Sequence, residues 1–226
     1  MTNIIPGEGS NHSILCFAVK GGVGKTLLST NLLAAALHSG HDAVGLDFDE
    51  QRSFATWAET RARRSIRPEA RIIPLRLRDW DRAMITARRH AVAVVDLPPG
   101  IAASEMHIIT DLARRVRLVL VPVRPNAASV LPIVRFGEVL TKAGADPYFV
   151  LNEVPPRGGE TADARAYLAR YGRLCPVEIP QRVDFQRAFG AGMAAADMPR
   201  MAGATAMSQL WGFVAERLAL HRDAAA

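Results

Sequence analysis

Some residue types and patterns are scarce in this chain of 226 residues, and each scarcity excludes a class of protein. No apolar run approaches the length of about 18 residues that a membrane-spanning helix needs. Residues 1–12 lack the apolar core of a signal peptide, so we expect a short disordered lead before a single domain at 13–222. Two cysteines occur, Cys16 and Cys175, and their wide separation is not that of metal ligands. Together these absences favour a protein of the cytoplasm without an integral membrane segment.

Lysine is also scarce, because the chain holds three lysines against 25 arginines. Two of the three, Lys20 and Lys25, lie in one stretch of seven residues, KGGVGKT at 20–26. Lysine offers a compact point charge on a flexible stem, which suits contact with a phosphate group. Its retention here, in a chain that otherwise uses arginine, marks this stretch as a candidate phosphate site.

The stretch lies between an apolar run at 14–19 and a helical pattern at 27–38, which predicts a strand, a glycine-rich loop and a helix. Glycines let backbone N–H groups approach an anion closely, and the positive end of the following helix points to the same place. We expect Lys25 to reach the β- and γ-phosphates of a nucleotide and the Thr26 hydroxyl to contact Mg²⁺. The predicted nucleotide-binding residues of this stretch are Gly21, Gly22, Val23, Gly24, Lys25, Thr26 and Leu27. The alternative is a chance glycine-rich turn before a helix.

The net charge of +6 suggests an anionic partner, either nucleic acid or a membrane surface. The charge is uneven, since residues 61–89 hold ten arginines and three acidic residues. The simpler interpretation of this segment is a set of solvated helix faces in an arginine-rich protein.

Strand and helix patterns alternate along the whole chain, which predicts a single α/β domain with a mostly parallel, twisted sheet and helices on both faces. The expected strands are 14–19, 43–46, 71–75, 91–95, 116–121, 148–151 and 177–179. The expected helices are 27–38, 51–64, 79–89, 105–113, 129–143, 161–171 and 205–221. Asp79 is expected to cap its helix, and Pro132 is expected in the first turn of the helix at 129–143.

Acidic residues follow two of the predicted strands, at the edge where ligands bind in open α/β sheets. Asp96 ends an apolar strand, which is the Walker B pattern of a carboxylate that holds Mg²⁺ through water. Asp47 and Asp49 follow the strand at 43–46. As alternatives, Asp96 caps a loop, and Asp47 and Asp49 cap the next helix.

KGGVGKT resembles the deviant Walker A motif of the ParA/MinD family of P-loop ATPases, in which the first residue is also lysine. The resemblance implies that two protomers enclose ATP between them. It also implies that Lys20 crosses to the partner's nucleotide and steadies charge during hydrolysis, as an arginine finger does. Hydrolysis of ATP to ADP and phosphate is then expected to be weak in isolation and stimulated by a partner.

The segment LDFDEQ at 46–51 resembles the family's Asp-x-Asp-Pro-Gln motif, with Glu50 in place of proline. By this resemblance Asp47 joins the water shell of Mg²⁺, and Asp49 orients or deprotonates the attacking water. Asp96, followed by Leu-Pro-Pro, resembles the family's switch segment. The implied catalytic residues are Lys20, Lys25 and Asp49, and the implied metal residues are Thr26, Asp47 and Asp96.

The last third of the chain resembles the family more loosely. Asn152 resembles the asparagine that contacts adenine, and residues 178–190 resemble the segment that closes over the base, with Pro180 and Val183 as implied contacts. Residues 199–204 resemble the stretch before the final helix, which contributes to DNA binding in several members. The implied DNA-binding residues are Arg182 and Arg200.

The leading hypothesis is a ParA-like ATPase that binds DNA without sequence preference as an ATP dimer and partitions or positions a plasmid, chromosome or other large cargo. A ParB-like adaptor would stimulate hydrolysis and release the dimer from the nucleoid. A ParA-like ATPase of conjugative DNA transfer fits the same residues.

Three other kinds of protein share the phosphate-binding pattern. A MinD-like positioning protein of the membrane surface predicts an amphipathic anchor, and the apolar stripe of the last helix is also explained by packing on the sheet. A nitrogenase-type iron protein needs cluster-binding cysteines near Asp96, and no cysteine lies between Cys16 and Cys175. A small-molecule ligase needs substrate-binding insertions, for which the chain is short.

Overall fold

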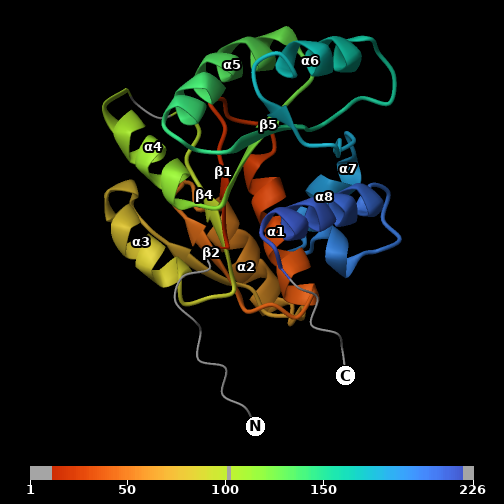
Figure 1. The fold of residues 1–226 in the computed structure, drawn as a ribbon. Coiled ribbons are helices and arrows are strands. Elements are labelled where there is room, and N and C mark those ends of the chain that lie inside the picture. Colours follow the sequence, from red (N-terminus) through yellow and green to blue (C-terminus); the bar gives the residue numbers. More distant parts are fainter. Residues whose placement is uncertain (1–11, 101–102, 221–226) are drawn as a thin grey trace.

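A computed structural model describes residues 12–100 and 103–220, which are built on one sheet of seven strands (Figure 1). The strands lie in the order β3-β2-β4-β1-β5-β6-β7, and every neighbouring pair is parallel. Their bounds are β1 Ser13–Cys16, β2 Ala43–Asp47, β3 Arg71–Pro74, β4 Val92–Asp96, β5 Leu118–Val123, β6 Pro147–Leu151 and β7 Arg173–Leu174. This confirms the predicted fold class. Residues 1–11 of the predicted disordered lead lie outside the described residues.

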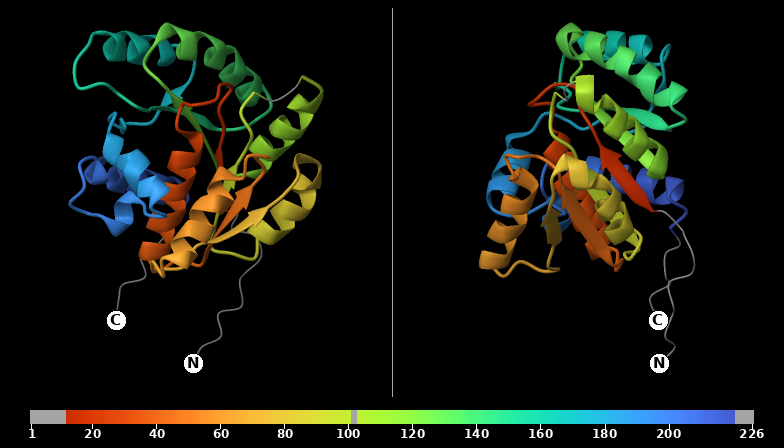
Figure 2. Two further views of the ribbon diagram at one scale, coloured as in Figure 1. Left: turned by 180° about the vertical axis from the view of Figure 1, so that it is seen from behind. Right: turned by 90° about the vertical axis from the view of Figure 1, so that its left-hand side faces the viewer.

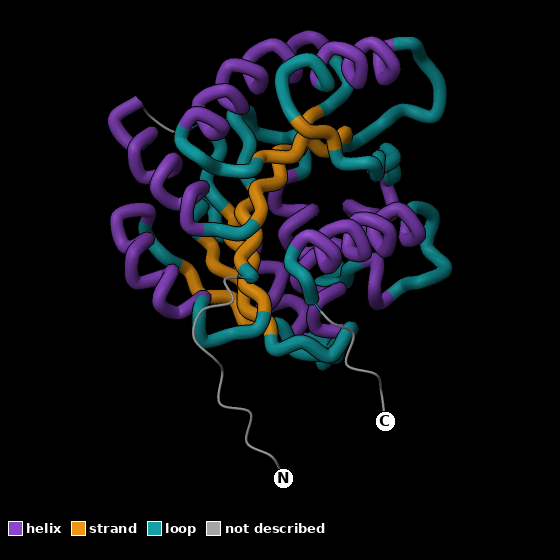
Figure 3. The backbone as a smooth tube through the Cα atoms, viewed as in Figure 1, coloured by secondary structure: helices purple, strands orange, loops and turns teal. Residues whose placement is uncertain are grey.

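Helices cover both faces of the sheet, and Figures 2 and 3 show the strands between the two helical layers. The helices are α1 Lys25–His38, α2 Ser53–Arg63, α3 Trp80–Ala87, α4 Met106–Arg115, α5 Ala127–Lys142, α6 Glu160–Leu168, α7 Val183–Gly190 and α8 Ala204–Arg217. Three short 3-10 turns, η1 Leu77–Asp79, η2 Ala103–Glu105 and η3 Ala195–Asp197, complete the described elements. One core layer includes α1, α2, α7 and α8, and the other includes α3, α4, α5 and α6.

Successive residues of the central strands face opposite layers, as strand geometry requires. Ile14 and Cys16 of β1 lie in the core with α1 and α8, whereas Leu15 lies in the core with α4 and α5. Both faces of the sheet are therefore covered, which is typical of a parallel sheet. Parallel strands place their carboxyl ends at one edge, so the segments that follow β1, β2 and β4 lie side by side.

Helix α5 begins earlier than the predicted range 129–143. Asn126 at its N-cap accepts a hydrogen bond from Ser129 N–H at 3.0 Å, and this cap starts the helix at Ala127. Pro132, which was expected in the first turn, lies inside the helix as its sixth residue. The prediction was wrong because it did not include the capping signal of Asn126. As a consequence, the interior of α5 lacks one backbone N–H donor.

The predicted strand at 177–179 was also wrong, since the seventh strand is β7 at Arg173–Leu174. After β7 the chain stays beside β6 through single hydrogen bonds, such as Ile179 N–H to Leu151 O at 2.9 Å. A proline on each side of this stretch lacks an N–H, so a regular ladder does not continue there.

Two helix starts differ from expectation as well. The sequence predicted the region of α7 only as a segment that closes over the nucleotide base, and not as a helix. The burial of Phe185 and Ala188 explains why it folds as a helix. Asp79 stands at the start of α3 without a capping side-chain hydrogen bond, because it belongs to the turn η1.

The apolar stripe of the last helix is buried. Met207, Leu210 and Val214 of α8 are at most 4% exposed and pack in the same core as α1. This confirms that packing explains the stripe. In the part of the chain that the structure describes, no helix combines the length and the apolar content that crossing a membrane requires. The predicted helix end at His221 lies outside the described residues.

Candidate functional site

The glycine-rich loop connects β1, which ends at Cys16, to α1, which begins at Lys25. Gly24 is the N-cap of α1 and adopts a left-handed backbone with φ of 85°. A Cβ at this position would lie 2.1 Å from Asn152 Nδ2, so glycine alone fits. Asn152 Nδ2 donates to Val23 O at 2.7 Å and thereby ties the loop to the end of β6.

Four of the predicted site residues meet at the start of α1. Lys25 is 6% exposed, and its Nζ lies 3.0 Å from Asp96 Oδ2 and 3.9 Å from Asp49 Oδ2. The Thr26 hydroxyl donates to Asp96 Oδ2 at 2.8 Å. A cation, a hydroxyl and two carboxylates therefore converge at the positive end of the helix, as a phosphate and metal site requires.

Ser29 belongs to this cluster and was not predicted. It is fully buried, and its hydroxyl donates to Asp96 Oδ1 at 2.7 Å. Both oxygens of Asp96 thus accept hydrogen bonds from side chains of α1, which fixes the orientation of the carboxylate. The position of Ser29 one helical turn after Lys25 is the sequence signal that could have found it. Burial raises the pKa of the neighbouring Cys16 to about 12, so this thiol stays protonated and is no nucleophile.

Asp47 ends β2 and lies opposite Asp96 in the register of β2 and β4. Its two oxygens accept the backbone N–H groups of Asp49 and Ala55, each at 3.0 Å. Because Ala55 lies in the first turn of α2, Asp47 caps that helix, as the alternative interpretation expected. Burial raises the pKa of Asp47, against the lowering effect of these two hydrogen bonds. A carboxylate has further lone pairs, so this cap and a role near Mg²⁺ are compatible.

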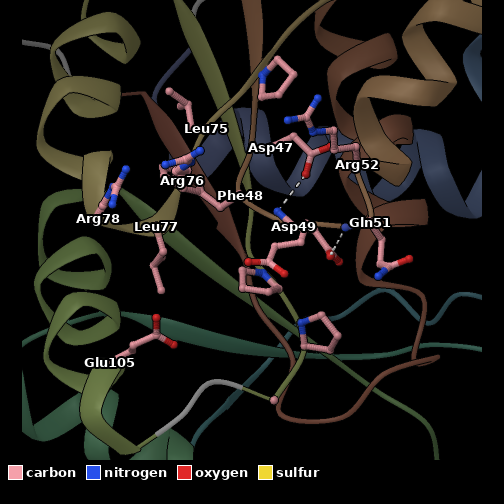
Figure 4. Close-up of a pocket in the computed structure, with 15 residues that line it drawn as sticks. Asp47, Phe48, Asp49, Gln51, Arg52, Leu75, Arg76, Leu77, Arg78 and Glu105 are labelled. Carbon is pink, nitrogen blue, oxygen red and sulfur yellow. Dashed lines mark hydrogen bonds between the residues drawn. The ribbon is translucent and has the colours of Figure 1, made fainter.

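Asp47 and Asp49 also line a cleft of about 640 Å³ at the carboxyl ends of β2, β3 and β4. Figure 4 shows one wall of the cleft with the backbone hydrogen bonds to Asp47 and Asp49, and the opposite wall with Arg76, Arg78 and Glu105. The cleft is lined by charges of both signs.

Asn152 is fully buried at the end of β6, and its Oδ1 has no hydrogen-bond partner among the described residues. A buried acceptor without a donor is costly and marks a place that a bound group can fill. An acceptor fits the exocyclic amino group of adenine and rejects the carbonyl oxygen of guanine. Pro180 forms a bridge with Val154, close to Asn152 in the chain, and Val183 is 60% exposed at the start of α7. These positions are consistent with a base site on this side of the loop.

Lys20 lies apart from the cluster around Lys25. Its side chain is exposed, and Nζ donates to the backbone O of Ala128, in the first turn of α5, at 2.5 Å. This contact lies within a single subunit. Its predicted action on a partner's nucleotide stays a prediction.

The arginines implied in DNA binding are exposed. Arg182 is the N-cap of α7, and Arg200 lies between η3 and α8. Arg61, which belongs to the basic segment 61–89, is fully buried, and its guanidinium donates to both oxygens of Asp197 at 2.6 and 2.8 Å. The solvated interpretation was therefore wrong for Arg61. Asp197 lies 136 residues away in the sequence, so no local pattern reveals the pair.

The oxygen atoms at the loop fit Mg²⁺. The Thr26 hydroxyl and the Asp96 carboxylate are in contact, Asp47 ends the neighbouring strand, and such hard oxygen donors suit this ion. Across residues 12–100 and 103–220, no three carboxylate, imidazole or thiol groups converge into a complete metal site. Water and phosphate oxygens would have to supply the remaining ligands, as they commonly do for Mg²⁺.

Residues 14–195 match the family model of the CobQ/CobB/MinD/ParA nucleotide binding domain. Among curated protein sequences, none matches this chain. The septum site-determining protein MinD from Pyrococcus horikoshii, complexed with Mg-ADP, is similar in structure, with a TM-score of 0.72 and 17% identity over 95% of this chain and 99% of that chain.

Two further solved structures have the same fold. A single-residue variant of McdA from Cyanothece, in complex with ATP, has a TM-score of 0.69 and 14% identity, over 94% of this chain and 98% of that chain. A protein from Borrelia burgdorferi described as a plasmid partition protein, bound to AMPPNP, has a TM-score of 0.67 and 13% identity, over 92% and 98%. Identities this low establish a common fold. The family match spans the glycine-rich loop, Asp47, Asp96 and Asn152, so the chain belongs to the CobQ/CobB/MinD/ParA family of nucleotide-binding domains.

Proposed function

We propose that this chain is a ParA/MinD-type ATPase that binds ATP with Mg²⁺, closes as an ATP-sandwich dimer and positions DNA or another large cargo. The observation that carries the proposal is the convergence of Lys25, Thr26, Asp49 and Asp96 at the glycine-rich start of α1. Solved structures of the same fold are described as complexes with ATP, with AMPPNP and with Mg-ADP, which supports the choice of nucleotide.

Lys25 is proposed to exchange partners when the nucleotide enters. In the structure its charge is balanced by Asp96 at 3.0 Å. The β- and γ-phosphates would then pair with the ammonium group of Lys25, and Asp96 would hold Mg²⁺ through water together with Thr26 and Asp47. Mg²⁺, when bound, neutralises charge on the phosphate oxygens. Asp49, which lines the cleft, would orient the attacking water, and the partner's Lys20 would steady the charge that develops.

Asn152 is proposed to select adenine. Its Nδ2 is already engaged with Val23 O, which leaves Oδ1 to accept a hydrogen bond from the base. Pro180 and Val183 would cover the base from the side of α7. A site that offers only an acceptor discriminates against guanine, whose corresponding group is also an acceptor.

We propose that the dimer binds DNA and that a ParB-like adaptor protein stimulates hydrolysis. The net charge of +6 and the exposure of Arg182 and Arg200 support contact with phosphate groups. The membrane alternative has less support, since the apolar side of α8 is used for packing in the core.

The test of this function is ATP binding and hydrolysis by the Lys25→Ala protein. We expect at least roughly a hundredfold loss of ATP affinity, because a charge-assisted contact with phosphate is removed. Lys142→Ala, at the end of α5, is the matched control and should bind as the parent does. Lys25→Met keeps the aliphatic stem and separates the loss of charge from the loss of packing. If both Lys25 variants bind ATP with unchanged affinity, the nucleotide does not bind at this loop.

A further inference from the structure

The proline inside α5 leaves one carbonyl of the helix without its usual donor. In an α-helix the N–H of residue 132 donates to the carbonyl of residue 128, but Pro132 has no N–H. The ring of proline also presses against the carbonyl four residues earlier and turns it away from the helix axis. The Ala128 carbonyl is therefore free to accept a hydrogen bond from outside the helix.

Lys20 supplies that hydrogen bond. Its Nζ lies 2.5 Å from Ala128 O, across 108 residues of sequence. Both residues are exposed, and the Asn126 cap fixes the start of the helix on which Ala128 stands. The acceptor is therefore well placed, while the ammonium group remains open to solvent.

The contact is easy to reverse. Ala128 lies in the first turn of α5, where the helix dipole disfavours a cation, and no described carboxylate makes an ion pair with Lys20. The carbonyl therefore holds the lysine by one exposed hydrogen bond against an unfavourable field. Such a contact can retain Lys20 without trapping it.

We propose that the Ala128 carbonyl, opened by Pro132, is a resting dock that keeps Lys20 in its own subunit until the ATP dimer forms. Pro132 is then a positioning residue for Lys20. The later destination of Lys20, at the partner's nucleotide, rests on the proposed function. The dock reduces the fraction of molecules whose Lys20 is free. The ATP concentration needed for dimer formation rises by the factor by which this fraction falls.

The first test measures the dock in the nucleotide-free protein by the rate at which an amine-acylating reagent labels each lysine. The chain has three lysines, so buried Lys25 and exposed Lys142 are internal references. In Pro132→Ala the new N–H draws the carbonyl back into the helix, and the labelling rate of Lys20 relative to Lys142 should rise about threefold, since one exposed hydrogen bond is lost.

The control is Val139→Ala, which changes an exposed position of α5, improves helix propensity and leaves Pro132 in place. It should label as the parent does. Both substitutions favour the helix, so both proteins should fold. An unchanged ratio of Lys20 to Lys142 labelling in Pro132→Ala would overturn the dock.

The second test measures how dimer formation, followed by light scattering, depends on ATP concentration. Pro132→Ala should reach half-dimerisation at about one third of the ATP concentration that the parent needs, matching the change in labelling. Faster labelling without this shift would refute the coupling of the dock to dimer formation. A parent protein that never dimerises with ATP would instead refute the proposed function, and the labelling result would still decide whether the dock exists.

Discussion

At the scale of single residues, the site depends on buried polar side chains that satisfy one another. Asp96 is fully buried, yet its two oxygens accept hydrogen bonds from Thr26 and Ser29 and one of them lies 3.0 Å from Lys25. A buried carboxylate is tolerated only when it is paired and hydrogen-bonded in this way. Ser29 is therefore a structural support of the site, although the phosphate-loop pattern does not include it.

Ser29→Ala should lower the free energy of unfolding of the nucleotide-free protein by about 2 kcal/mol. The reason is that a buried carboxylate oxygen loses a hydroxyl donor and no water replaces it. Urea unfolding followed by circular dichroism measures the change. Ser208→Ala, on the exposed face of α8, is the matched control and should be neutral or slightly stabilising. Equal stabilities for the two variants would show that the Ser29 hydroxyl does not support Asp96.

At the scale of elements, the sequence predicted six of the seven strands near their observed positions, because apolar runs between glycine- and proline-containing segments are clear in a fully covered parallel sheet. It also placed Lys25, Thr26, Asp47 and Asp96 at one edge, because each follows or opens a regular element. The start of α5 was missed by two residues, since its signal is a single capping side chain, Asn126.

The remaining elements were hidden because they depend on contacts between distant segments. Strand β7 has two residues and is recognisable only by its pairing with β6. In the sequence, Arg61 cannot be distinguished from the solvated arginines around it. Only the folded structure places Asp197 of η3 against its guanidinium. Side-chain pairs of this kind have no local pattern, so the sequence alone could not have separated Arg61 from its exposed neighbours.

The Asp197 carboxylate links η3 to α1 and α2. Its oxygens lie 2.7 Å from His38 Nε2 of α1 and 2.6 and 2.8 Å from the guanidinium nitrogens of Arg61 of α2. Burial by itself would raise the pKa of Asp197, but the hydrogen bonds from Arg61, His38 and Ala194 N–H outweigh it, and the pKa lies below its ordinary value of 3.8. The carboxylate thus stabilises the fold at pH values above 3.8. That contribution is lost as the pH falls through the lowered pKa.

Asp197→Asn should therefore cost about 3 kcal/mol of unfolding free energy at pH 7, because Arg61 is left buried without its counter-charge. The difference between parent and variant should shrink as the pH is lowered toward 3. Urea unfolding at pH 7, 5 and 3 measures it, with Asp111→Asn on α4 as the control. A difference that grew on acidification would contradict the assignment.

At the scale of the whole molecule, the burial of Arg61 changes how the charge excess is distributed. The net charge of +6 is carried by exposed arginines, and in segment 61–89 two of them are near acids, Arg63 at 4.0 Å from Glu59 and Arg67 in contact with Glu69. These pairs reduce the local field that the segment offers to a polyanion. Arg182 and Arg200 remain the candidates that the family resemblance favours.

DNA binding should need ATP and should weaken steeply with salt, because only a dimer presents enough arginines to one duplex. Arg200→Ala is expected to weaken binding to all sequences alike and to reduce the log–log salt slope by about 1, the value for one phosphate contact. Fluorescence anisotropy with two unrelated duplexes measures this, with exposed Arg157→Ala as the control.

The opposing outcome is equally informative about the DNA face. If Arg200→Ala has no effect while the combined replacement of Arg63, Arg64 and Arg67 by alanine abolishes binding, the contact surface lies at the end of α2. If the ATP-bound protein shows no salt-sensitive binding to either duplex, DNA is not the partner.

The pairing of Lys25 with Asp96 also bears on how substitutions in the site affect the fold. The counter-charge of Lys25 comes from the adjacent strand, 3.0 Å from the ammonium group. Replacing one partner alone therefore leaves the other as a buried, uncompensated charge, whereas replacing both by uncharged residues of similar volume leaves no such charge.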